Sequence, residues 1–109
     1  MRDHVVKVKS WEEFKRLAME LKPDSIVYNI EQSGLSSARE LTCLRLIMPT
    51  KENYYIFIDF PKDEKLRETS IPFHRDKRGS RYIEEVDVIN FLKTQLGREN
   101  LTICSYWTI

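Results

Sequence analysis

The sequence predicts an α+β fold with two helices packed on one face of a mainly antiparallel sheet of five to seven strands. Two segments, 10–22 and 84–96, have the apolar spacing of amphipathic helices. At least five other segments are short apolar or alternating runs typical of strands. The chain has 109 residues, about the size of one domain, so we expect a single α+β domain over residues 1–109.

The first helix is the best-marked element. A short strand over 4–9 is expected before it, because valines alternate there with polar residues. Ser10 and Glu13 form a capping box, in which the Ser10 hydroxyl accepts a hydrogen bond from the Glu13 backbone N–H. Pro23 should end the helix near Lys22. One apolar stripe lies between these signals: Phe14, Leu17, Ala18 and Leu21.

Three strands are expected in the middle of the chain. The run 25–31 alternates apolar and polar residues, so one of its faces should be buried. A loop over 32–40 separates it from two strongly apolar runs, 41–48 and 53–60, which should form an antiparallel hairpin. Because 53–60 is apolar on both faces, we expect it near the centre of the sheet.

A solvated connection is expected over 61–69, because that segment is charged and mixed in sign. After it, 71–74 and 81–83 could pair as a second hairpin around the turn 76–79. Gly79 would take the positive-φ position of that turn, since glycine carries no Cβ to clash there.

The second helix, 84–96, has acidic residues in its first turn and Gly97 just beyond its end, as helix termini prefer. A last strand is expected over 101–109. The element order is then β-α-β-β-β-hairpin-α-β. Without its middle additions this order is βαββαβ, which predicts a ferredoxin-like core with an inserted strand or hairpin.

Composition restricts the class of protein. Charged residues make up 32% and hydrophobic residues 41%, which is typical of a globular chain with a lean toward thermophiles. The net charge of +1 argues against a general nucleic-acid coat. We find no run long enough to span a membrane and no signal peptide at the first residues, so we expect a cytoplasmic protein without a membrane partner. Cys43 and Cys104 are expected to be buried small hydrophobes; a disulfide is the alternative.

One segment carries a local excess of positive charge. Four cations and one anion lie between Arg75 and Arg81, with aromatic residues on both sides. Cations attract phosphates and rings offer stacking faces, so the segment predicts binding to nucleic-acid backbone or another polyanion. A solvated loop is the alternative, and no RNP, KH or helix-turn-helix pattern is present. The predicted contact residues are Phe73, His74, Arg75, Lys77, Arg78, Arg81 and Tyr82.

Two other functions are compatible with the sequence. The strand 101–109 would lie at a sheet edge, where Tyr106 and Trp107 could form a homodimer interface. Alternatively, Asp59 and Asp63 could hold a metal ion in a nuclease. The acidic pair is a poor imitation of such a site, because Asp63 falls in a loop. With no glycine-rich phosphate loop and no nucleophile beside a histidine, we predict a non-enzymatic binding module without catalytic residues, metal or cofactor.

Overall fold

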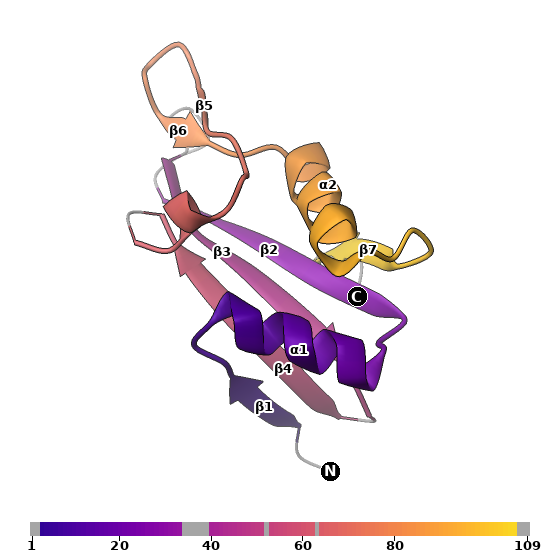
Figure 1. Cartoon of the computed structure of the whole chain (residues 1–109). Coiled ribbons are helices and arrows are strands. Elements are labelled where there is room, and N and C mark those ends of the chain that lie inside the picture. Colours follow the sequence, from indigo (N-terminus) through magenta and orange to yellow (C-terminus); the bar gives the residue numbers. More distant parts are fainter. Residues whose placement is uncertain (1–2, 34–39, 52, 63, 107–109) are drawn as a thin grey trace.

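The structure is a computed structural model that describes residues 3–33, 40–51, 53–62 and 64–106 (Figure 1). A five-stranded sheet and two helices form the body, and a two-stranded ribbon projects from one end of it. The elements are β1 (His4–Lys7), α1 (Trp11–Leu21), β2 (Ser25–Ser33), β3 (Glu40–Pro49), β4 (Tyr54–Pro61), the short 3-10 helix η1 (Leu66–Glu68), β5 (His74–Arg75), β6 (Arg81–Tyr82), α2 (Glu85–Leu96) and β7 (Thr102–Ser105). The α+β class predicted from the sequence is therefore confirmed.

The sheet is mixed, with the strand order β1-β4-β3-β2-β7. Its centre is the antiparallel meander β2-β3-β4, in which consecutive strands pair with each other. The two outer strands add in parallel, β1 beside β4 and β7 beside β2. Only the two central pairings match the mainly antiparallel sheet that the sequence predicts.

This strand order differs from the predicted ferredoxin-like core. In that split βαβ pattern each helical connection joins two parallel strands that have one other strand between them. Here both helical connections cross two strands, from β1 to β2 and from β4 to β7. The reason is that the three consecutive middle strands pair locally and take up the centre, so the first and last strands are left with the edges. β3 is thus the central strand of the sheet and not an insertion into it.

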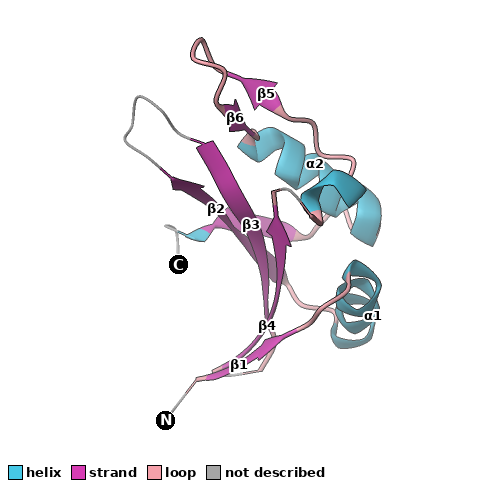
Figure 2. Cartoon of the chain, turned by 90° about the vertical axis from the view of Figure 1, so that its left-hand side faces the viewer, coloured by secondary structure: helices cyan, strands magenta, loops and turns pink. Residues whose placement is uncertain are grey.

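Both helices lie on one side of the sheet (Figure 2). The Ser10 hydroxyl caps α1 by accepting from the Glu13 N–H at 3.1 Å, as the capping box predicts. Lys22, in the left-handed region, ends α1, and Gly97 with φ 63° ends α2. Between helices and sheet lies the hydrophobic core, whose fully buried side chains include Phe14, Leu44, Leu46, Ile58, Val88 and Leu92. Neither α1 nor α2 lies over the opposite face of the sheet, which we call the helix-free face.

The second hairpin is confirmed, although it is shorter than predicted. Only His74–Arg75 and Arg81–Tyr82 pair as strands, and they form a separate ribbon, not a part of the main sheet. Gly79 takes the predicted positive φ, 84°. No helix of the described chain is long and apolar enough to cross a membrane.

Candidate functional site

The turn of the β5–β6 ribbon is built around Asp76. One carboxylate oxygen of Asp76 accepts hydrogen bonds from the backbone N–H groups of Arg78 and Ser80, both at 2.9 Å. The backbone closes the same turn, because the Asp76 N–H donates to the Ser80 carbonyl at 3.0 Å. The single anion among the cations of this turn therefore organises the backbone on which they stand.

The base of the ribbon is attached to the sheet by Glu40, the first residue of β3. Its carboxylate accepts from the Arg81 backbone N–H at 2.6 Å and from Arg81 Nε at 3.1 Å. Lys62, the residue after β4, donates from Nζ to the same carboxylate at 2.9 Å. The hydrogen bond from Lys62, followed by that from the Arg81 backbone, lowers the pKa of Glu40 from 4.5 to about 2. Arg81, predicted to contact phosphate, is thus also a structural residue.

The aromatic residues of the ribbon are engaged in packing. Phe73 packs against the hydrophobic core, and the Arg81 guanidinium lies 5.9 Å from its ring centroid. Tyr82 stacks on His74 across the two strands, with ring centroids 5.4 Å apart. All of these side chains are partly buried. A nucleic-acid base could reach only their remaining exposed surface, which gives stacking a smaller part than the sequence suggests.

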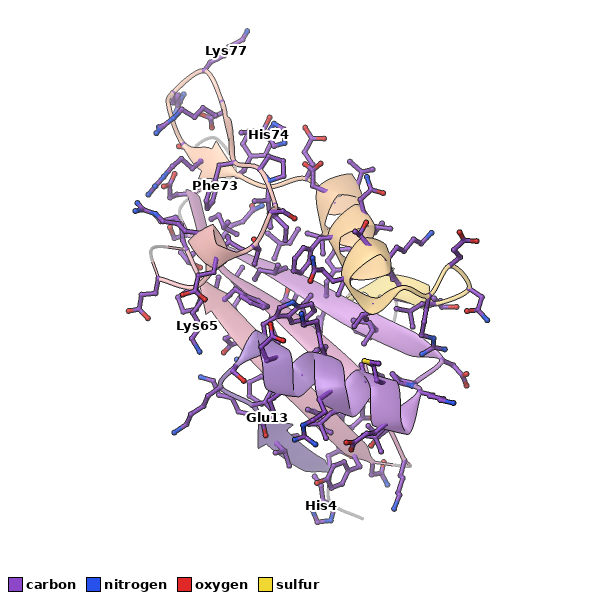
Figure 3. All side chains as sticks on the ribbon, in the orientation of Figure 1. His4, Glu13, Lys65, Phe73, His74 and Lys77 are labelled. Atoms are coloured by element: carbon purple, nitrogen blue, oxygen red, sulfur yellow. The ribbon has the colours of Figure 1, made fainter. Side chains whose placement is uncertain are left out.

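Apart from Arg81, the cations within residues 75–81 are exposed. Arg75, Lys77 and Arg78 stand at the end of the ribbon, and Figure 3 shows Lys77 at the tip, directed away from the rest of the molecule. Arg75 donates to the Gly79 carbonyl at 3.0 Å, which leaves its charge unneutralised. Lys77 and Arg78 form no ion pair with an acidic residue in the described part of the chain. These three residues define the basic tip.

His74 faces a pair of carboxylates at the start of α2. Its Nε2 atom lies 2.9 Å from Asp87 Oδ2 and 3.9 Å from Glu84 Oε1. We call these three residues the His74 cluster. Sequence reasoning placed His74 among phosphate-binding residues and did not connect it with the two acids. Only the i, i+3 spacing of Glu84 and Asp87 at a helix start hints that those two share a face.

Asp59, a predicted nuclease ligand, is held by cations on the helix-free face of the sheet. Arg45 donates to both of its carboxylate oxygens, at 2.7 and 3.0 Å, and Lys7 lies 3.7 Å away. The Arg45 hydrogen bonds lower the pKa of Asp59 against the opposing effect of burial. Asp63, its proposed partner, lies outside the described residues. A carboxylate occupied by arginine is a poor metal ligand, which weighs against the nuclease hypothesis.

The last strand lies at a sheet edge, as the sequence predicts. Among the described strands, β7 pairs with β2 alone. Tyr106 follows it, is half exposed, and lines a shallow groove on the helix-free face together with Val5, Arg45, Ile47, Tyr55 and Phe57. Trp107, the other predicted interface residue, lies outside the described residues. Tyr106 therefore connects the edge strand β7 with a largely apolar groove.

The two cysteines are free thiols, each partly buried, so the alternative of a disulfide is not observed. Burial raises the pKa of Cys43 to about 11, which keeps this thiol protonated at neutral pH. Comparison of the chain with protein-family models and with curated proteins finds no match.

Proposed function

We propose that the protein binds the phosphate backbone of nucleic acid, or a polyanion of similar charge density, through the basic tip. The observation that carries this proposal is the position of Arg75, Lys77 and Arg78 at the end of a ribbon that projects from the body. Three exposed cations with no acidic partner among the described residues can approach successive phosphates, while the body of the protein stays clear of the polymer.

The ordered turn supports the proposal because it reduces the entropy cost of binding. The Asp76 hydrogen bonds and the Glu40 contacts hold the backbone from the tip to the base of the ribbon. Only the side chains of the tip must then be ordered on binding, at roughly 0.5–1.5 kcal/mol each. Backbone phosphates carry no sequence information, so binding should be tolerant of sequence.

Charge reversal at the tip tests the proposal. Lys77→Glu with Arg78→Glu should lower the affinity for a fluorescent single-stranded oligonucleotide at least about tenfold, measured by anisotropy at low salt. The melting temperature of this double variant should stay close to that of the wild type, because neither Lys77 nor Arg78 is buried. Wild-type affinity should fall with salt along a log–log slope of about −2 to −3, since up to three phosphates are neutralised.

A matched control reverses the same number of charges elsewhere. Lys9 and Lys93 are exposed, and neither forms an ion pair with a described residue. Lys9→Glu with Lys93→Glu changes the net charge equally and should retain most of the affinity. If both double variants lose affinity alike, only net charge matters and the tip is not the site. Absence of wild-type binding to single- and double-stranded probes below about 100 μM would also refute the proposal.

A second candidate function is self-assembly, favoured by the position of β7 at the sheet edge. Two copies could pair their β7 strands about a two-fold axis, with Tyr106 and Trp107 adding apolar contact area. Light scattering across a concentration series tests this. Tyr106→Ala or Trp107→Ala should shift a dimer to monomer, whereas tip variants should leave it unchanged. A wild-type protein that is monomeric at high concentration excludes this function.

A further inference from the structure

We propose that His74, Glu84 and Asp87 form a binding site for a divalent transition-metal ion, with zinc as the best-suited ion. The ligand atoms are His74 Nε2 and one carboxylate oxygen each from Glu84 and Asp87. This site is separate from the basic tip and does not depend on polyanion binding.

The distances within the His74 cluster are close to those of a metal site. Three ligands at about 2.1 Å from a tetrahedral ion lie about 3.4 Å from one another. Here the ligand atoms are separated by 2.9 Å between His74 and Asp87, by 3.9 Å between His74 and Glu84, and all lie within 4.8 Å of one another. Carboxylate movements on the order of 1 Å would bring all three onto one ion.

The chemistry of the three ligands suits zinc. One imidazole and two carboxylates supply nitrogen and oxygen ligands, and the two negative charges balance a divalent ion. All three side chains are partly exposed, so water can complete the coordination shell. Magnesium prefers six oxygen ligands in an octahedron and is poorly matched by a site with an imidazole.

The fold orients these residues toward one another. Adjacent residues of a strand point to opposite faces, so His74 and Tyr82 share one face of the ribbon while Arg75 and Arg81 share the other. The nearest strand cations therefore point away from the site. The His74 ring is also held by its stacking on Tyr82, with centroids 5.4 Å apart. A ring that is already oriented loses little freedom on binding a metal.

Glu84 is not used as a helix cap. It occupies the N-cap position of α2, where a side chain commonly accepts a backbone N–H, yet it makes no such bond. Its carboxylate is directed to His74 instead, one helical turn from that of Asp87. A metal ion here would join the ribbon to α2, two elements that this cluster otherwise connects through a single close contact of 2.9 Å.

Zinc titration of the 109-residue chain tests the site. Isothermal calorimetry with zinc chloride in a non-chelating buffer should give one binding event per chain, and magnesium chloride should give none. Zinc at about a hundredfold excess over the dissociation constant should raise the melting temperature on the order of 10 °C.

Variants locate the binding. His74→Ala and Asp87→Asn should each weaken zinc binding by at least about tenfold. Asp87→Asn is nearly isosteric, so it tests the site even if His74→Ala is poorly folded. His4→Ala removes the other histidine, which is exposed in β1, and Cys43→Ser with Cys104→Ser removes both thiols. Both controls should bind zinc as the wild type does.

Three results would overturn the proposal. The first is a wild-type chain that binds no zinc at millimolar concentration. The second is zinc binding that survives both His74→Ala and Asp87→Asn. The third is an equal loss of binding in either control, which would place the ion elsewhere on the chain.

Discussion

Single residues connect parts of this chain that are far apart in sequence, and Glu40 is the clearest example. Its carboxylate, only 29% exposed, joins the end of β4 through Lys62 and the base of the ribbon through Arg81. Its pKa is lowered from 4.5 to about 2, so the unfolded chain binds this proton more readily than the folded protein does. The stabilisation is therefore fully present above about pH 4.5 and is lost as the pH falls toward 2.

Replacement of the Glu40 carboxylate should make the free energy of unfolding depend less on pH in the acid range. We expect Glu40→Gln to unfold more easily than the wild type at pH 6, with the difference shrinking between pH 4.5 and about 2. Urea unfolding at a series of pH values measures this. Glu20→Gln, which removes an exposed carboxylate from α1, is the control. If the two variants give the same profile, the Glu40 contacts do not stabilise the fold.

At the scale of elements, the two helices start in different ways. α1 has a side-chain cap, the 3.1 Å hydrogen bond between the Glu13 N–H and the Ser10 hydroxyl, whereas the N-cap Glu84 of α2 makes none. Ser10→Ala should lower the free energy of unfolding by about 1 kcal/mol. Glu84→Ala, measured with a chelator present, should change it by less than about 0.5 kcal/mol. A Ser10→Ala loss in urea unfolding below about 0.5 kcal/mol would show that the Ser10 cap does not stabilise the fold.

Elements with strong local signals were predicted well. The apolar stripe and cap of α1, the turn at Gly79 and the hairpin between β3 and β4 all depend on residues a few positions apart. The ribbon strands were predicted too long, because Ile71 is buried as a core residue without pairing as a strand. Burial and strand pairing give the same apolar pattern in such a short run.

At the scale of the whole molecule, the mixed sheet should be least stable at its first strand. All four residues of β1 are exposed, and its one partner among the described strands is β4. In contrast, Leu46 in β3 and Ile58 in β4 are buried at the centre of the sheet. Hydrogen exchange followed by NMR should therefore be at least about tenfold faster for the β1 amides bonded to β4 than for those of Leu46 and Ile58. Equal protection would mean that the sheet opens only as a unit.

The sequence by itself determined the α+β class, the two helices with their ends, and the exposed cluster of Arg75, Lys77 and Arg78 on a turn. These features depend on spacing over a few residues, where propensity, capping and turn chemistry act directly. Only the tertiary structure decided the strand order and the contacts of Glu40 with Arg81 and of His74 with Asp87. Glu40 and Arg81 are 41 positions apart in the sequence, and His74 and Asp87 are 13 positions apart, so no local pattern connects them. The strand order is likewise hidden, because an apolar pattern shows which face of a strand is buried but not which strand lies beside it.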